Sequence, residues 1–382
     1  METVSVAVDI SRASVKAVAF SFDKNAKSAG LIDHQKLALP PTGDKLDGFL
    51  RALATLRVFI EGVIKEHRVR ISDISVSVPS ALLLSEVREF RFVRPSPETS
   101  LSDGELTGLW RLVRDQAAEA LLPQGAAEDS YSIFIPEAER VTIDGYPLSG
   151  DRRGTGREII ISALVSAWSE DFAGVADGLR ANFPSADISF APEAVLISDY
   201  IHLRRGATVS GVVVDIGARD STLLLFDHGV LEDLWALPFG GEDISKAIAK
   251  ELSITLVDAE QKKRQWIRGS IDAPVAKRIG HAASRVTDFW KREWGSILAS
   301  RAATAVVLPH VYLLGMGALL PGLAEALSEL EWLESFSAGA AGDVSLLLPG
   351  DEEKEFFPGW PFEDSGDAVL FSLVSRMIHK RT

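Results

Sequence analysis

Two strand hairpins stand out in the pattern of apolar and polar positions along the chain. In the first, apolar residues alternate with small ones over residues 4–8 and end at Asp9, and a second strand follows the turn. In the second, the apolar strand at 212–214 ends at Asp215, and residues 221–226 return after a short turn. Because both hairpins read strand, Asp-Ile, turn, strand, we predict two similar halves that face one cleft.

The segments between the hairpins predict a first lobe that carries an insertion. Apolar residues at helical spacing predict a helix within 44–67, and residues 71–80 indicate a buried strand closed by a proline. The pattern then changes to a strand near 86–93, a helix over 102–122, strands within 131–143 and 157–167, and a helix from Ser169. This order predicts a compact inserted subdomain of βαββα type.

We therefore expect an α/β chain with two lobes, in the following order. The first lobe comprises residues 1–80 and 184–208, the inserted interaction subdomain 81–183, and the second lobe 209–354 with a mostly helical part at 243–300; residues 355–382 form a C-terminal helix that returns to the first lobe. That last helix is apolar on one face and basic at its end, which also suits an interfacial membrane helix. Its shortness and its direct connection to the fold favour a packed helix.

Composition narrows the functional classes. The chain of 382 residues has a formal net charge of -14, which argues against a nucleic-acid surface because phosphate contacts need clustered Lys and Arg. It contains no cysteine, which excludes disulfides, thiol catalysis and cysteine zinc sites, and its seven histidines are scattered without a His-x-x-x-His pair. No signal peptide and no apolar run of the ~20 residues that span a bilayer is visible. We expect a cytoplasmic protein whose membrane contact goes through a partner.

The second hairpin carries the first chemical hypothesis. An acid at a strand end followed closely by glycine, as in Asp215-Ile216-Gly217, places a carboxylate beside a metal-bound phosphate while bare backbone amides approach the phosphate oxygens. The pattern predicts a nucleotide site.

Five short motifs then occur in one order along the chain. They are DISRASVK (9–16), DIGARDST (215–222), GGED (240–243), DAEQKK (258–263) and GMGALLPG (315–322). This order, over nearly the full length, resembles the actin-like ATPase superfamily, which includes sugar kinases, heat-shock chaperones and actin. The insertion follows VSVPS (76–80), a position similar to that in the cell-division protein FtsA and in PilM, the actin-like protein of type IV pilus assembly.

Details of the motifs favour a PilM-like over an FtsA-like chain. The phosphate turn reads Asp-Ile-Gly-Ala where FtsA proteins typically carry three glycines and Thr-Thr-Asp, and residues 259–263 are similar to the Ala-Glu-x-Lys-Lys pattern of the pilus proteins. The chain also ends without a linker and a separate amphipathic tail. Against this, VTIDGYPLSGDRRGTGREIIIS resembles the corresponding FtsA stretch, so both alternatives stay open.

The resemblance implies a set of phosphate and metal residues. Asp9 and Asp215 would bind Mg²⁺, mainly through water, and Gly217 with the backbone amides from Ser11 to Ser14 would approach the β- and γ-phosphates. Lys16 matches a phosphate-facing lysine, although a basic residue on a hairpin needs no such role. Gly240 and Gly241 would begin a helix whose N-terminal dipole faces the phosphates.

The resemblance also implies the residues around the nucleoside. Glu260 and Lys263 match a pair that hydrogen-bonds the ribose and the adenine edge, and the alternative for them is a solvated helix face. Gly315 and Gly317 would let the adenosine lie against bare backbone, while Met316 packs on the base or fills the core.

Three positions depart from the superfamily pattern or bear on hydrolysis. Ser11 replaces the glycine expected after Asp-Ile, and Arg219 stands where small or hydroxyl residues are usual. That arginine would either neutralise a γ-phosphate or pair with Asp9 or Asp215 in a nucleotide-free protein. Glu193 is the one candidate for positioning a catalytic water, and a plain helix N-terminal acid is the favoured interpretation.

Three functions remain open. The favoured one is a scaffold that binds ATP and Mg²⁺, is at most a weak ATPase, and holds the short cytoplasmic tail of an inner-membrane assembly protein, as expected for a PilM-like chain. An FtsA-like protein would instead link the division tubulin to the membrane and self-associate into filaments. The third is a nucleotide-free structural pseudo-ATPase, which Ser11 and Arg219 make credible.

Overall fold

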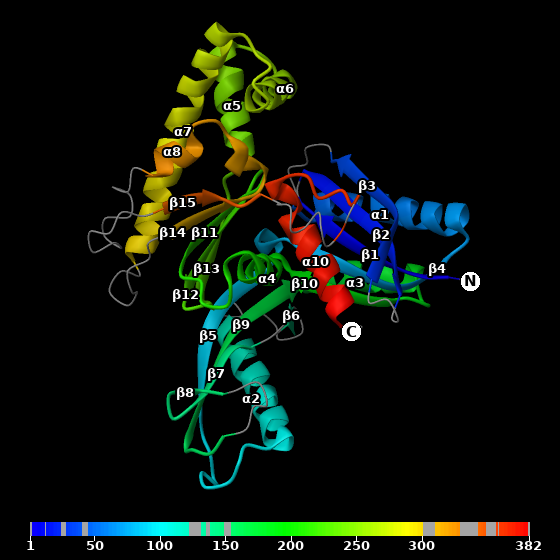
Figure 1. Ribbon diagram of the computed structural model, residues 1–382, viewed down its shortest axis with the longest axis vertical. Helices are drawn as coiled ribbons and strands as arrows, with labels where there is room; N and C mark the ends of the chain where they lie inside the picture. The colour runs from blue at the N-terminus through cyan, green and yellow to red at the C-terminus, as the bar shows by residue number, and fades with distance from the viewer. Residues whose placement is uncertain are drawn as a thin grey trace.

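The computed structural model of the chain shows two lobes and a third, smaller unit (Figure 1). It describes residues 2–11, 13–23, 28–39, 45–121, 131–134, 138–148, 154–300, 310–328, 343–348, 357 and 359–380. Each of the three units is built on its own β-sheet, and helices cover the sheet faces.

The first lobe contains a five-stranded sheet of order β10-β4-β1-β2-β3. Its strands are β1 (Thr3–Ile10), β2 (Ser14–Asp23), β3 (Ser28–Ala38), β4 (Arg70–Val78) and β10 (Asp187–Pro192). Strand β1, which carries Asp9 near its end, runs antiparallel to its neighbour β2 and parallel to its neighbour β4. Alternating valines make β1 suitable for this central position because both of its faces are buried.

The second lobe repeats this sheet in the same order. Its strands are β11 (Gly211–Ile216), β12 (Ser221–Asp227), β13 (Val230–Leu237), β14 (His310–Leu314) and β15 (Asp343–Leu346). The order β15-β14-β11-β12-β13, with β11 antiparallel to β12 and parallel to β14, matches that of the first sheet strand by strand. The prediction of two similar halves is confirmed.

Helices sandwich each sheet. Helices α1 (Lys45–His67) and α3 (Glu170–Asn182) pack on one face of the first sheet, and α5 (Gly241–Leu252), α6 (Leu256–Ile267), α7 (Ala273–Ala299) and α8 (Leu323–Ser328) cover the outer face of the second. Between the lobes lie α4 (Glu193–Arg205) and α10 (Ala368–His379), whose side chains share one core with both sheets (Figure 1).

The C-terminal helix α10 is part of this central core. Its apolar side chains are buried against α4 and the first sheet: Val369, Leu370, Leu373, Val374 and Met377. The apolar face is therefore covered by the protein itself, as the packed-helix alternative expects. Within the described part of the chain, no helix is both long enough and apolar enough to cross a membrane.

The inserted unit follows β4. It comprises β5 (Leu84–Val93), α2 (Asp103–Leu121), β6 (Tyr131–Phe134), β7 (Ala138–Ile143), β8 (Tyr146–Pro147) and β9 (Glu158–Ser169), with α2 packed on the sheet. Helix α3, which follows β9, buries Phe172, Ala176 and Leu179 in the core of the first lobe rather than in that of the insertion. The domain boundaries drawn from the sequence stay a prediction.

Candidate functional site

A cavity of about 550 Å³ lies between the two lobes, where β1 and β11 end. Most of the residues that the motifs nominate line it: Asp9, Ser11, Ser14, Lys16, Glu193, Asp215, Gly217, Gly241, Glu260, Lys263, Gly315, Met316 and Gly317. Arg219 and Gly240 are not among its lining residues. The fold thus brings motifs that are far apart in sequence to one cavity.

Asp9 and Asp215 hold equivalent places in the two sheets. Ser77 Oγ donates to Asp9 Oδ1 over 2.8 Å. Burial raises the pKa of Asp9, although the charge of Lys16 and the Ser77 hydrogen bond oppose it. Burial and then the charge of Asp9 raise the pKa of Asp215 to about 7. Both acids are buried and resist ionisation. A divalent cation bound to them would stabilise their charged forms, so these residues fit Mg²⁺.

Glu193 joins the two aspartates from the first turn of α4. Its Oε2 accepts a hydrogen bond of 2.9 Å from the backbone N–H of Ser80. Burial and then the charge of Asp215 raise the pKa of Glu193 to about 8. Glu193 is thus both an acid at the N-terminus of a helix and a residue that lines the cleft.

The first phosphate turn satisfies its own amides. Ser11 Oγ accepts hydrogen bonds from the backbone N–H of Ser14 (3.0 Å) and of Ala13 (3.3 Å), and Ser11 N–H donates to Ser14 O over 2.9 Å. Residue 12, between them, lies outside the described residues. The serine in place of glycine therefore engages, inside the turn, backbone amides that were expected to face phosphate.

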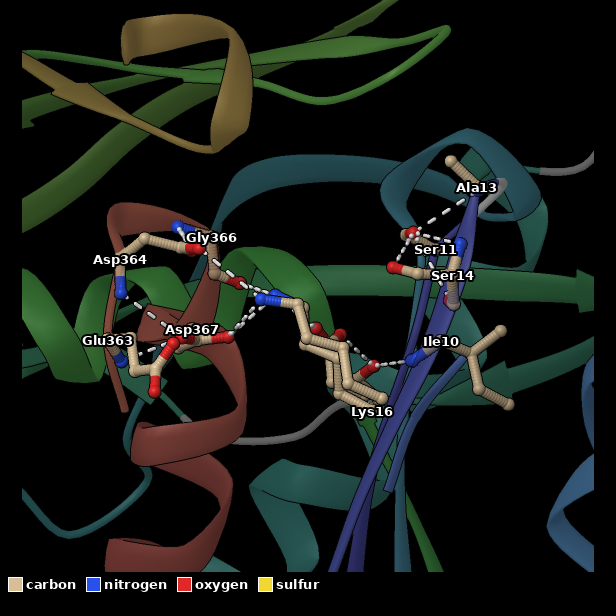
Figure 2. A network of polar contacts seen from close by, with 12 residues as sticks. Ile10, Ser11, Ala13, Ser14, Lys16, Glu363, Asp364, Gly366 and Asp367 are labelled. Atoms are coloured by element: carbon tan, nitrogen blue, oxygen red, sulfur yellow. Dashed lines mark hydrogen bonds and ion pairs between the residues drawn. The ribbon is translucent and has the colours of Figure 1, made fainter. Parts of the chain in front are cut away.

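Lys16 points into the cavity and is almost fully buried, with 5% of its surface exposed. Its Nζ lies 3.0 Å from Asp367 Oδ1 and 3.8 Å from Asp9 Oδ2, and it also donates to the carbonyl oxygen of Gly366 (Figure 2). Burial acts to lower the pKa of Lys16, but the charges of Asp9 and Asp367 outweigh it and raise the pKa. The lysine is a charged member of the site.

The second phosphate turn is bonded to the helix that follows it. Gly241 N–H donates to Gly217 O over 3.0 Å, and a Cβ on Gly240 would lie 2.7 Å from the same oxygen. Arg219 Nε donates to Glu242 at the start of α5. Gly240 thus allows α5 to pack closely on the turn. The Arg219 guanidinium pairs with an acid of α5, whereas one of the two alternatives from the sequence expects it to pair with Asp9 or Asp215.

Glu260 and Lys263 form one polar cluster on α6. Lys263 Nζ donates to Glu260 Oε2 and to Gly241 O, each over 2.7 Å, and Ser245 Oγ donates to Glu260 over 2.6 Å. Burial lowers the pKa of Lys263. Burial acts to raise the pKa of Glu260, but the charge and hydrogen bond of Lys263 outweigh it and lower the pKa. The pair faces the cavity, so the solvated-face alternative does not describe Lys263, which is 8% exposed.

The glycine turn after β14 closes the other side. Gly315 adopts φ +80°, and a Cβ there would lie 2.4 Å from Asp215 Oδ1. A Cβ on Gly317 would lie 2.3 Å from Ile216 Cγ2. Met316, between them, is 46% exposed and lines the cavity, which fits packing on a ligand better than filling the core.

Several lining residues were missed by sequence reasoning. They are Lys36 on β3, Arg264 and Arg268 at the end of α6, and the segment Glu363, Asp364, Ser365 and Gly366 before α10. A cap signal was available in the last segment, because Asp364 and Asp367 form a capping box ahead of an apolar helix. Nothing in the sequence pattern indicated that this cap faces Lys16.

The sequence matches no protein-family model and no curated protein. The fold is similar to that of a chain in the solved "PilM-PilN type IV pilus biogenesis complex", with 19% identity, a TM-score of 0.66 and coverage of 98% of each chain. Weaker likenesses include EutJ, an ethanolamine utilization protein from Carboxydothermus hydrogenoformans (13% identity, TM-score 0.48, 96% of this chain and 88% of that one). Another is MreB 5 of Spiroplasma citri bound to AMPPNP (9%, 0.43, 100% and 98%). The chain has the two-lobed actin-like fold, in its PilM-like form.

Proposed function

We propose that the protein is a nucleotide-binding cytoplasmic scaffold of the PilM-like kind, peripheral to the inner membrane through a partner. One observation carries the nucleotide part: a cavity of about 550 Å³ between the lobes gathers the strand-end acids, a buried lysine and two glycine turns. The sequence motifs and the resemblance they carry predict a role for each of these residues. Their meeting in one cavity supports a ligand with an anionic end and a flat, partly apolar end.

ATP with Mg²⁺ is the proposed ligand. Asp9 and Asp215 would hold the ion, which supplies charge neutralisation for phosphate oxygens when bound. Lys16 and Gly217 line the same end of the site, while Glu260 and Lys263 would receive the ribose and base edge. Gly315 and Gly317 leave bare backbone where the nucleoside would lie.

The proposal is binding with at most weak hydrolysis. Glu193 is the candidate for orienting a water, and its carboxylate already accepts the Ser80 amide. With a pKa near 8 it is largely protonated at neutral pH while no cation is bound, which makes it a poor base. Nucleotide occupancy would then act by shifting the relation of the two lobes rather than by turnover.

A short cytoplasmic tail of an inner-membrane protein is the proposed partner, held between the insertion and the first lobe. The solved complex with a similar fold pairs PilM with PilN, which supports a partner of that kind. The insertion also exposes large apolar side chains that a peptide could cover: Leu84, Val93, Leu112 and Tyr146.

One observation favours a second candidate, a nucleotide-free pseudo-ATPase. Ser11 engages the amides of the first turn, and Asp367 engages Lys16, so part of the phosphate-binding equipment is already partnered. In that case the lobes would be held in one arrangement and only the partner site would be active.

Calorimetric titration of the full chain with Mg-ATP tests the proposal. We expect saturable binding of ATP and ADP to the wild type, and loss of Mg²⁺-dependent binding in Asp215→Asn. Asp227→Asn, at the end of the neighbouring strand and outside the lining of the cavity, is the matched control. No heat of binding at millimolar Mg-ATP would exclude the scaffold and leave the pseudo-ATPase. Rapid phosphate release at saturating ATP would exclude the claim of at most weak hydrolysis.

A further inference from the structure

Lys16 and Lys36 form a cross-strand pair at the phosphate end of the cavity. They are direct partners in the register of β2 and β3, so their side chains leave the same face of the sheet. Both line the cavity, Lys16 buried and Lys36 with 49% of its side chain exposed. Like charges directly opposite each other are destabilising, so this pair needs an anion between its two ends.

The segment before α10 supplies that anion. Asp367 Oδ1 lies 3.0 Å from Lys16 Nζ and 3.6 Å from Lys36 Nζ, and Asp364 Oδ2 lies 3.3 Å from Lys36 Nζ. Figure 2 shows Lys16 reaching from its strand to this segment, with bonds to Gly366 and Asp367. Asp367 is 1% exposed and also accepts the backbone amides of Glu363 and Asp364, so its carboxylate is held in place.

We propose that the two lysines form an anion site which the acidic segment 363–367 fills in the ligand-free protein, and from which the phosphate tail of a nucleoside triphosphate displaces Asp367. Lys36 is then a second phosphate-binding residue, beside Lys16. This inference rests on the proposed nucleotide function and adds to it a built-in competitor for the same lysines.

A phosphate group can take the place of the Asp367 carboxylate at the two lysines. A phosphate group carries more charge than a carboxylate and offers three acceptor oxygens, so it competes well for an ammonium group. When the lysines turn to phosphate, Asp367 retains the backbone amides of Glu363 and Asp364. The buried carboxylate is therefore not left without partners.

The same segment touches the second lobe. Ser365 Oγ donates to Gly315 O over 2.8 Å, and Gly315 N–H donates to Ser365 O over 3.3 Å. The acidic segment therefore contacts both the lysine hairpin of one lobe and the glycine turn of the other. When Lys16 changes its partner, this segment can therefore alter the contact between the lobes.

Asp367→Asn and Asp364→Asn test the competition by calorimetry with ATP, inorganic tripolyphosphate and adenosine. Asparagine keeps an acceptor for the backbone amides, and Asp364→Asn also keeps the cap on Gly366 N–H. We expect roughly tenfold tighter binding of ATP and of tripolyphosphate in Asp367→Asn, a smaller gain in Asp364→Asn, and unchanged affinity for adenosine. Should Asp367→Asn fail to fold, Asp364→Asn alone decides.

Lys36→Gln tests the second phosphate residue, with Lys65→Gln at the exposed end of α1 as a control of equal charge change. We expect Lys36→Gln to bind ATP several-fold more weakly, with a smaller dependence on salt, and Lys65→Gln to match the wild type. Equal affinities in the two variants would overturn the role of Lys36.

The remaining outcomes separate this inference from the nucleotide proposal. If the wild type binds ATP and neither asparagine variant binds it more tightly, the competition is wrong and the nucleotide site stands. Suppose instead that the variants bind tripolyphosphate more tightly, that adenosine does not bind, and that ATP binds no more tightly than tripolyphosphate. The competition then stands and the nucleotide proposal fails. If neither ATP nor tripolyphosphate binds to any of the proteins, both are wrong.

Discussion

Glu193 and Ser80 are joined by a hydrogen bond of 2.9 Å between residues 113 positions apart in the sequence. Glu193 lines the cavity beside Asp215, whereas Ser80 is the second residue after β4, where the chain leaves the first lobe for the insertion. The acid cluster of the cavity and the root of the inserted unit therefore share a direct contact. A change in the charge of Glu193 should therefore affect both the acid cluster and the start of the insertion.

The first prediction concerns pH. Because the pKa of Glu193 is raised to about 8 and that of Asp215 to about 7, the folded state holds protons that the unfolded chain has released. Stability of the ligand-free protein should fall as pH rises from about 5 to 8, since the folded state is the one that binds more protons in this window. Thermal unfolding as a function of pH measures the slope.

Glu193→Gln should flatten this slope, most clearly above pH 7, where Asp215 is already largely ionised. The amide keeps an oxygen for the Ser80 N–H, so at pH 8 the variant should exceed the wild type by at least about 1 kcal/mol in unfolding free energy. Glu119→Gln, on the exposed side of α2, changes the same charge and should keep the wild-type slope. Parallel curves for the wild type and Glu193→Gln would contradict the prediction.

The second prediction concerns the inserted unit. Arg94 has 1% of its side chain exposed and makes two hydrogen bonds to Glu105, at 2.6 and 2.8 Å, and two more to the carbonyls of Thr99 and Gly156. Glu105→Ala leaves this buried cation without its anion and should destabilise the insertion by about 3 kcal/mol. Hydrogen exchange should show the loss in α2 and β9, with the second lobe unchanged.

The exposed pair Arg91 and Glu89 on β5 provides the comparison. Its two side chains are 59% and 44% exposed and lie 2.9 Å apart, so Glu89→Ala should cost less than about 1 kcal/mol. If both alanine variants accelerate exchange equally, the ion pair of Arg94 is no more important than a surface pair.

Much of this fold could be predicted because the apolar pattern is local. The two hairpins follow from alternating valines and leucines that end in Asp9 and Asp215, and the sheet register confirms that these residues are equivalent. The order of the motifs indicates many of the residues that line the cavity, but not Lys36 or the segment before α10. Contacts set by tertiary packing could not be predicted: Lys16 meets Gly366 across 350 residues, and no periodicity in either segment specifies the other.

Two local features depend on contacts that the sequence pattern does not specify. The hydroxyl of Ser11 turns inward because three backbone groups of its own turn, the amides of Ala13 and Ser14 and the carbonyl of Ser14, lie within hydrogen-bonding distance. Helix α3 lies within the range 81–183 that the sequence predicts for the insertion. Its apolar residues show that one face is buried, but not which surface covers it, and Phe172 packs with Phe49 of α1.

The third prediction compares two glycines that share nearly the same positive φ. Gly315 and Gly322 adopt φ of +80° and +79°, but a Cβ on Gly322 meets no atom within 4 Å. Gly322→Ala should therefore cost only about 1 kcal/mol, the strain of a left-handed alanine. In Gly315→Ala the new methyl would lie 2.5 Å from the carbonyl oxygen of Ile216, so we expect at least about 2 kcal/mol more and loss of nucleotide binding. Urea unfolding of both variants measures the difference, and equal losses would show that the turn has room.

The last prediction concerns the nucleoside end of the cavity. Lys263 Nζ ties Glu260 to the carbonyl of Gly241, so Lys263→Met removes a cation and two hydrogen bonds while keeping the aliphatic bulk. We expect roughly tenfold weaker binding of both ATP and adenosine, because the ribose and base edge lose an oriented donor and acceptor pair. Binding of tripolyphosphate should not change. Lys262→Met, one residue away and outside the lining of the cavity, is the matched control and should bind all three ligands as the wild type does. Equal losses for adenosine and tripolyphosphate would instead mean that Lys263 supports the whole cleft through α5, and the assignment of the pair to the nucleoside would be wrong.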